Sequence, residues 1–176
     1  MRTPLSPPFW KTIGQIRGDL FAFARSISDS LHEAEDLVSD AIERAARAEN
    51  RPKDPGALRP WMFRIIRNLN VDELRKRRVR REYSVSATRF DGISAWARNG
   101  IEDGILIREA FDKLEAKQRE VLCLVDILGM TYKEAAAVMD VPAGTIMSRV
   151  SRARRALLSR MDAGQVVPYR KGRKRE

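Results

Sequence analysis

The sequence predicts an all-α protein made of two small helical domains joined by a flexible linker. Three observations support this fold class. Apolar residues recur at steps of three and four over residues 13–27 and again in later segments, which is the period of an amphipathic helix. Serine and threonine residues stand at capping positions ahead of several of these segments. Valine, isoleucine and tyrosine never alternate with polar residues for long, so strands find little support.

Three helices are expected in the N-terminal half. The first carries the apolar stripe of residues 13–27. Ser30 is followed three residues later by a glutamate, the spacing of a capping box, so a second helix should begin there. Residues 49–59 contain two prolines and a glycine, which predicts a loop. Because proline is tolerated in the first turn of a helix, a third helix is expected over residues 60–81.

Four shorter helices are expected in the C-terminal half. Gly129 is suited to the position just past a helix end. Thr131 is followed three residues later by a glutamate and should cap the next helix. Residues 140–144 include a proline and a glycine and break the chain, and Thr145 is expected to cap the last helix. The apolar stripes place these helices at residues 107–114, 121–128, 132–139 and 146–161.

Composition excludes several classes of protein. The chain has 176 residues, of which 43% are hydrophobic and 33% charged, so it can bury a core. No stretch approaches the roughly 18 consecutive apolar residues of a membrane span, and no secretory signal is visible, so no membrane insertion and a cytoplasmic location are expected. A single cysteine and a single histidine argue against a metal cluster and a catalytic triad. The sequence therefore gives no support for a cofactor or for these catalytic sites, and an enzyme is the least supported class of function.

Charge is distributed in two basic blocks. The net charge is +10, with +6 in residues 1–81 and +6 in residues 105–176, while residues 82–104 carry −2. This intervening strip lacks a sustained helical period and is predicted to be a linker. Such a basic chain is expected to bind a polyanion, most often nucleic acid. The predicted organisation is a domain over 9–81, a linker over 82–104, a domain over 105–162 and a basic tail over 163–176.

The last two helices have the spacing of a helix-turn-helix, whose second helix enters the DNA major groove. Ser148 and Arg152 lie one turn apart on the face opposite the apolar stripe. An arginine there can donate two hydrogen bonds to guanine, worth roughly 1–3 kcal/mol of discrimination between bases. Arg149, Arg154 and Arg155 are better placed to contact phosphates. The competing interpretation is a solvated basic face on an ordinary helical hairpin.

The chain resembles the extracytoplasmic-function sigma factors of bacterial RNA polymerase. The resemblance covers about residues 13–161 and rests on motifs in the family's order and spacing. The sequence departs from the family at Glu115, where proline is usual, and at Ser39 and Pro60. The matching segments are 35–41 (EDLVSDA), 59–68 (RPWMFRIIRN), 72–78 (DELRKRR), 118–122 (QREVL), 132–136 (YKEAA) and 144–154 (GTIMSRVSRAR).

The resemblance implies how the N-terminal domain acts. An acidic helix would dock on the coiled coil of the largest polymerase subunit, through Asp36, Leu37, Asp40 and Glu43. A loop at residues 50–58 would hold a base flipped from the −10 element, with donors at Asn50, Arg51 and Lys53. Residues along one side of the third helix would read or hold the −10 strand. These are Asn68, Asp72, Arg75 and Arg78, with phosphate contacts from the basic run 75–81.

The resemblance also implies how the C-terminal domain acts and how the protein is controlled. This domain would read the −35 element through Thr145, Ser148, Arg149, Ser151, Arg152 and Arg155. The implied partners are the RNA polymerase core, including its flap, promoter DNA and an anti-sigma factor. The expected function is to give polymerase promoter specificity for a stress-type regulon. Within the family, the sequence most resembles alphaproteobacterial members.

Other interpretations stay open at this stage. A conventional helix-turn-helix regulator would bind duplex DNA without polymerase but leaves the acidic helix unexplained. A basic RNA-binding protein would bind with steep salt dependence and no promoter preference. Trp61 is expected in the core, although stacking on a base is the alternative. Cys123 is expected to be buried, with a redox sensor as the rival, and His32 to be an ordinary surface residue.

Overall fold

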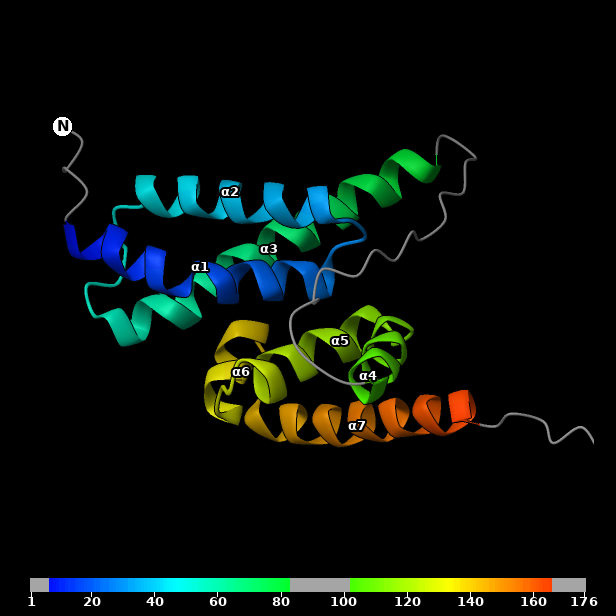
Figure 1. The fold of residues 1–176 in the computed structure, drawn as a ribbon. Coiled ribbons are helices and arrows are strands. Elements are labelled where there is room, and N and C mark those ends of the chain that lie inside the picture. The colour runs from blue at the N-terminus through cyan, green and yellow to red at the C-terminus, as the bar shows by residue number, and fades with distance from the viewer. Residues whose placement is uncertain (1–6, 83–101, 166–176) are drawn as a thin grey trace, which may run out of the picture.

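In a computed structural model the described residues, 7–82 and 102–165, are almost entirely helical (Figure 1). Three helices form an N-terminal bundle and the remaining elements form a C-terminal bundle. The N-terminal bundle contains α1 (Pro7–Ile27), α2 (Leu31–Arg47) and α3 (Pro55–Glu82). The C-terminal bundle contains α4 (Glu102–Asp112), α5 (Ala116–Leu122), the π-helix η1 (Cys123–Ile127), α6 (Tyr132–Met139) and α7 (Ala143–Gln165).

The N-terminal bundle closes around the apolar stripes of its three helices. The stripe of α1 is buried as predicted, and the ring of Phe23 meets that of Phe63 on α3 edge to face, with centroids 5.3 Å apart. The Ser30 hydroxyl accepts a hydrogen bond from the Glu33 amide at 3.1 Å, so the predicted start of α2 is confirmed. Trp61 packs against the same core, which also confirms its prediction.

The start of α3 differs from the sequence prediction. The helix begins at Pro55, and Pro60, expected in its first turn, lies inside it. Asp54 explains the earlier start, because its carboxylate accepts a hydrogen bond from the Ala57 amide at 2.9 Å and caps the helix. Proline at the first helical position loses no hydrogen bond. The loop between α2 and α3 is therefore shorter than predicted, and Leu58 is a buried core residue.

Local signals in the C-terminal bundle mostly act as expected. Gly129 has a φ of +66°, the left-handed conformation that ends the helix there. The Thr131 hydroxyl caps α6, and the Glu134 carboxylate accepts the Thr131 amide hydrogen in return, at 2.8 Å. At Glu115, where the family usually has proline, the amide donates to the Gln118 side chain at 3.2 Å and α5 begins at the next residue.

The last helix begins three residues earlier than predicted. The α7 helix starts at Ala143, and the Pro142 carbonyl accepts the Thr145 amide at 2.9 Å. Thr145 is therefore inside the first turn and is not the cap. The turn before it is made by Asp140, which adopts the left-handed conformation with a φ of +54°. This tight turn between α6 and α7 completes the predicted helix-turn-helix.

The two bundles are stacked on one another (Figure 1). Helix α1 contacts α5 and η1, and α3 contacts α6, while α7 lies on the far side of the C-terminal bundle. The predicted linker, apart from its first residue and its last three, and most of the predicted tail lie outside the described residues. No helix among the described residues has the length and apolar character needed to cross a membrane.

Candidate nucleic-acid interface

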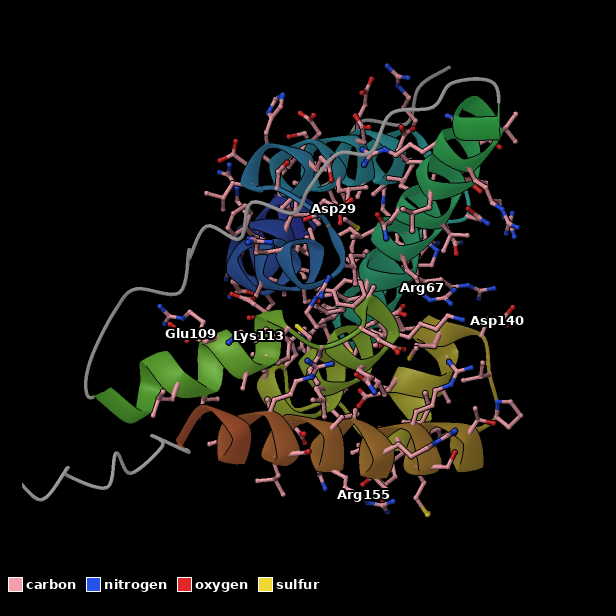
Figure 2. The ribbon with its side chains drawn as sticks, turned by 90° about the vertical axis from the view of Figure 1, so that its right-hand side faces the viewer. Asp29, Arg67, Glu109, Lys113, Asp140 and Arg155 are labelled. Carbon is pink, nitrogen blue, oxygen red and sulfur yellow. The ribbon has the colours of Figure 1, made fainter. Side chains whose placement is uncertain are left out.

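The outward face of α7 carries the side chains predicted to read DNA. Ser148, Ser151, Arg152 and Arg155 are all exposed, while Ile146, on the opposite side of the helix, is fully buried. In Figure 2 Arg155 points away from the N-terminal bundle. The helical period thus separates the core-facing residues of α7 from a polar face that is open to a large ligand.

Arg152 is positioned by the helix turn below it. Its Nε donates to the Ser148 carbonyl at 3.2 Å, and its Nη2 lies 3.4 Å from the Ser148 hydroxyl. The Ser148 hydroxyl donates to the Thr145 carbonyl at 3.0 Å. These contacts hold the guanidinium along the exposed face, where its remaining N–H groups can donate to a base edge or a phosphate.

Two of the residues predicted for this face lie at its margin. Thr145 and Arg149 are half-buried rather than exposed. Arg149 lies near enough to the buried Glu120 to act on it electrostatically, so its positive charge tends to lower the pKa of that carboxyl. We therefore place these two residues at the edge of the interface and the four exposed residues at its centre.

Arg154, which the sequence predicts to contact a phosphate, forms an ion pair within the protein, and the phosphate contact stays a prediction. Its guanidinium is bound by the Asp126 carboxylate of η1, with an Nη2–Oδ1 distance of 2.5 Å and an Nε–Oδ2 distance of 3.1 Å. The hydrogen bond to Asp126 raises the pKa of Arg154. This bidentate pair ties the middle of α7 to η1, and it joins residues 28 positions apart, which no local motif indicated.

The loop between α2 and α3 offers fewer free donors than predicted. Asn50 and Lys53 are exposed, as a DNA contact requires. Arg51 is half-buried: its Nη1 donates to the Ala45 carbonyl at 3.3 Å, and its guanidinium lies 4.7 Å from the centre of the Phe9 ring. Arg51 therefore closes the end of α2 over α1, and its role as a DNA donor stays a prediction.

One side of α3 is exposed along several turns. Asn68, Asp72, Arg75 and Arg78 all lie on it, and Arg75 is 3.8 Å from Asp72. The structure therefore brings together the four residues predicted for the −10 strand. Their spacing of three and four residues makes a continuous polar strip.

Arg77, in the middle of the basic run, faces the protein instead of solvent. Its guanidinium contacts Glu33 at 2.8 Å, Glu73 at 3.3 Å and Asp29 at 3.6 Å. The hydrogen bond to Glu33 is the main cause that raises the pKa of Arg77. The basic run 75–81 is thus not uniform, because one of its arginines holds α3 against the start of α2.

The acidic face of α2 is exposed, but one predicted member is not part of it. Asp36, Asp40 and Glu43 lie on the surface, with His32 3.7 Å from Asp36 and Arg47 paired with Glu43. Leu37 is 9% exposed and belongs to the core, because its position on the helix faces α1 and α3. The acidic surface therefore consists of the three carboxylates, and Leu37 supports it from behind.

A charged contact between the bundles was not predicted from the sequence. Arg67 of α3 donates to Glu120 of α5, with an Nε–Oε1 distance of 2.7 Å, and both are largely buried. Burial raises the pKa of Glu120, and the charge of Arg67 opposes this shift. Arg119 is also buried, and burial lowers its pKa. These residues lie in segments that resemble the family motifs. Because Arg67 and Glu120 are 53 positions apart, the sequence did not indicate that they pair.

The remaining titratable candidates have simple surroundings. Cys123 is fully buried as predicted, and burial raises the pKa of its thiol to about 12, which opposes the thiolate that a redox sensor needs. His32 lies on the surface as expected, with its side chain 83% exposed. Within the described ranges no three histidine, cysteine or carboxylate side chains gather as a metal site would require.

Comparison with known proteins identifies both bundles. Residues 12–80 match the family described as sigma-70 region 2, and residues 105–157 match sigma-70 region 4. These segments contain, respectively, the exposed strip of α3 with the acidic face of α2, and the helix-turn-helix. The order of the two matches along the chain is the order that the sequence motifs indicated.

Similar proteins share both segments. The chain is 40% identical to an ECF RNA polymerase sigma factor, EcfG, of Rhodopseudomonas palustris over 142 residues, covering 78% of this chain and 76% of the relative. It is 37% identical over 144 residues to a probable RNA polymerase sigma-C factor of Mycobacterium bovis, covering 80% and 76%.

A solved structure shares the arrangement. The sigma factor RpoE of Bartonella quintana, solved in complex with the anti-sigma factor NepR, has a TM-score of 0.80 and 32% identity, covering 89% of this chain and 98% of that chain. Together with the exposed faces of α2, α3 and α7, these likenesses show that the chain belongs to the ECF sigma factors of bacterial RNA polymerase.

Proposed function

We propose that this chain binds core RNA polymerase, directs it to a set of stress-type promoters and opens them. Two matched regions in order, each with an exposed polar face on one of its helices, carry this proposal. As a regulatory subunit the chain supplies promoter recognition, while polymerase performs the chemistry. Because polymerase acts in the cytoplasm, we propose that this chain acts there too. We assign residues 9–81 and 105–162 to the two functional domains, residues 82–104 to the linker and residues 163–176 to a tail.

The C-terminal domain is assigned to the −35 element. Ser148, Ser151 and Arg152 occupy the centre of the exposed face of α7 and are proposed to contact base edges in the major groove. Arg155 continues this face by one turn and is proposed to contact a phosphate. Arg149 and Thr145, at the margin, are proposed to contact the backbone beside the groove.

The N-terminal domain is assigned to the −10 element. The exposed strip of α3 is proposed to hold the separated strand, with Asn68 and Asp72 near the bases and Arg75 and Arg78 near the phosphates. The neighbouring loop, with Asn50 and Lys53, is proposed to hold a flipped base. Holding such a base recovers part of the few kcal/mol that unstacking costs.

Protein partners are assigned by charge and by relationship. Asp36, Asp40 and Glu43 form an acidic surface suited to a basic helix, and we propose that this surface docks on the coiled coil of the largest polymerase subunit. The C-terminal domain is assigned to the polymerase flap. One relative was solved with the anti-sigma factor NepR and another, CnrH, with the cytosolic domain of CnrY. We propose that an anti-sigma protein controls the present chain.

Run-off transcription tests the proposal. Core polymerase with this protein should start transcripts at new, discrete sites on genomic promoter fragments, while core polymerase alone should not. Identical start sites with and without the protein would contradict it. A stand-alone regulator would instead bind operator duplex tightly without polymerase, which an electrophoretic assay of the protein by itself would reveal.

A further inference from the structure

An exposed tryptophan lies at the start of the first helix. Trp10 of α1 is 47% exposed, whereas Phe9 beside it is 4% exposed and belongs to the core. Among the residues whose burial the structure describes, the other aromatic side chains are buried or half-buried. The indole is a large and mainly apolar ring, so exposing it to water is unfavourable. Packing within the described part of the chain therefore does not account for the position of Trp10.

The indole ring is supported from one side. The Phe9 ring meets the Trp10 ring edge to face, with centroids 5.1 Å apart and an interplanar angle of 68°. The Arg51 guanidinium lies 4.7 Å from the centre of the same Phe9 ring. Phe9 is thereby held between α1 and the loop after α2, and it supports Trp10 in turn. A ring supported in this way loses little freedom when another flat ring stacks on it.

The flank of the indole toward the next helical turn is open. A helical side chain leans back over the turn before it, so a side chain at position 14 would lie against Trp10. Position 14 is a glycine, and a Cβ built there would meet no described atom within 4 Å. Glycine weakens an exposed helix relative to alanine, and no close packing requires it here. Gly14 therefore leaves space beside the ring for a ligand.

Trp10 lies beside the loop that we propose holds a flipped base. Figure 1 shows the start of α1 and the segment between α2 and α3 at the same end of the N-terminal bundle. The contacts through Phe9 that connect them span only a few nucleotides, since stacked bases are ~3.4 Å apart. Lys11 and Lys53 are exposed in these two segments and can contact phosphates. Aromatic rings beside basic side chains are the usual arrangement for binding single strands.

We propose that Trp10 stacks on an unpaired base of the opened promoter, next to the base assigned to the loop of Asn50 and Lys53. This inference rests on the proposed function. Every base has a flat face, so Trp10 contributes affinity for the separated strand and little preference between bases. The contact forms only with a base that has left the duplex, and it therefore favours the open promoter over the closed one.

Binding of the polymerase complex to a single-stranded oligonucleotide tests the inference. The labelled oligonucleotide covers the −10 element and several nucleotides on either side, and fluorescence anisotropy measures its affinity. Trp10→Ala should weaken binding about 5- to 100-fold, the loss expected for one stacked base. Trp10→Phe keeps an aromatic ring and should stay within about 3-fold. Gln15→Ala is the matched control on the exposed part of the same helix and should stay within about 2-fold.

Abasic nucleotides identify the stacked base. Each nucleotide is replaced in turn by an abasic analogue, and at one position this should weaken wild-type binding about as much as Trp10→Ala does. The same analogue should cause no further loss in the Trp10→Ala complex, because the two changes remove one shared contact.

A substitution at Gly14 separates stacking from stability. Gly14→Leu should cover the ring and weaken oligonucleotide binding, while the melting temperature stays the same or rises because leucine favours a helix more than glycine does. Weaker binding by a protein of equal or greater stability cannot result from unfolding. Full binding by Gly14→Leu would exclude a base stacked at this position.

The possible results distinguish this inference from the proposed function. Equal binding by Trp10→Ala and Gln15→Ala, or an abasic scan that is the same for Trp10→Ala and wild type, would overturn the inference while the wild-type complex still starts transcripts at new sites. A parallel loss of affinity for core polymerase would place Trp10 in a protein contact and overturn it as well. Failure of the wild-type complex to bind the oligonucleotide more tightly than core polymerase alone would instead contradict the proposed function itself.

Discussion

The two bundles use similar arginines for different purposes. In the N-terminal bundle, Arg51 closes a helix end and Arg77 binds three carboxylates, so basic residues in DNA-binding segments serve the fold. In the C-terminal bundle, Arg152 and Arg155 lie on the outward face of one helix, while Arg154 of the same helix is held by a carboxylate. The difference shows that position on a helix, more than local charge density, decides which arginine is available to DNA.

The architecture explains this difference. Helix α7 buries one side, so every residue on the opposite side is exposed by the helical period. Helix α3 contacts α1 and α2 of its own bundle and α6 of the other, so some residues of its basic run face protein. Adjacent residues of the same basic run, such as Lys76 and Arg77, consequently have different surroundings.

The largest expected effect belongs to Arg152. Arg152→Ala should lower promoter-specific initiation about 10- to 100-fold, because a bidentate contact to a base contributes roughly 1–3 kcal/mol. Run-off transcription measures this change, and binding to core polymerase should stay within about 2-fold. Arg160→Ala, an exposed arginine farther along α7, is the control and should have little effect. Equal loss of polymerase binding would contradict the assigned role.

Arg77 and Arg75 should behave in opposite ways. Arg77→Ala leaves Glu33, Glu73 and Asp29 without their common partner and should lower the free energy of unfolding by about 1–2 kcal/mol. Arg75→Ala, an exposed neighbour, should change stability by less than about 0.5 kcal/mol yet weaken binding to a single-stranded −10 oligonucleotide in the polymerase complex. Urea denaturation and fluorescence anisotropy measure the two quantities. If Arg77→Ala instead weakened oligonucleotide binding and Arg75→Ala lowered stability, Arg77 rather than Arg75 would be the residue that contacts DNA.

Local signals account for what the sequence could predict. The caps at Ser30 and Thr131 and the left-handed Gly129 involve residues within four positions of one another, so the chain alone specifies them. The exposed face of α7 follows from its period. The start of α3 was missed because the two prolines near it favoured a loop, whereas Asp54 provides a cap that tolerates the first of them.

Long-range contacts account for what the sequence could not predict. The partners of Arg59, Arg67 and Arg119 are decided by the packing of one bundle on the other, which no periodicity encodes. The pairing of Arg154 with Asp126 likewise depends on packing that no periodicity encodes. The helical period therefore indicates the exposed faces but not the residues that hold those faces in place.

Arg155 and Arg154 test the comparison within α7 itself. Arg155→Ala should remove one phosphate contact and reduce the slope of log affinity against log salt by about 0.9. Arg154→Ala should leave that slope unchanged, because Asp126 holds its guanidinium. Binding of the polymerase complex to promoter DNA at several salt concentrations measures both slopes. A similar decrease for the two variants would show that Arg154 exchanges Asp126 for a phosphate.

The smallest expected effect concerns the capping boxes. Hydrogen bonds from Thr131 hold the pKa of Glu134 below its ordinary value, so this carboxylate stabilises the fold above its unfolded pKa of about 4.3. The contribution is lost as the pH falls through the lower, folded pKa. Thr131→Ala should therefore cost about 0.5–1 kcal/mol at pH 7 and less at pH 3. Ser30→Ala, which removes the cap in the other bundle, is the control and should retain the contribution of Glu134. Thermal melts from pH 7 to 3 compare the stabilities of the two variants.

Site-specific photocrosslinking tests the division of labour between the bundles most directly. A photoreactive amino acid replaces Asn68 on α3 or Ser148 on α7, both of which are exposed, and each protein is assembled with core polymerase on promoter DNA. The account predicts crosslinks to the −10 element from position 68 and to the −35 element from position 148. Crosslinks from both positions to the same element, or to no DNA at all, would contradict it.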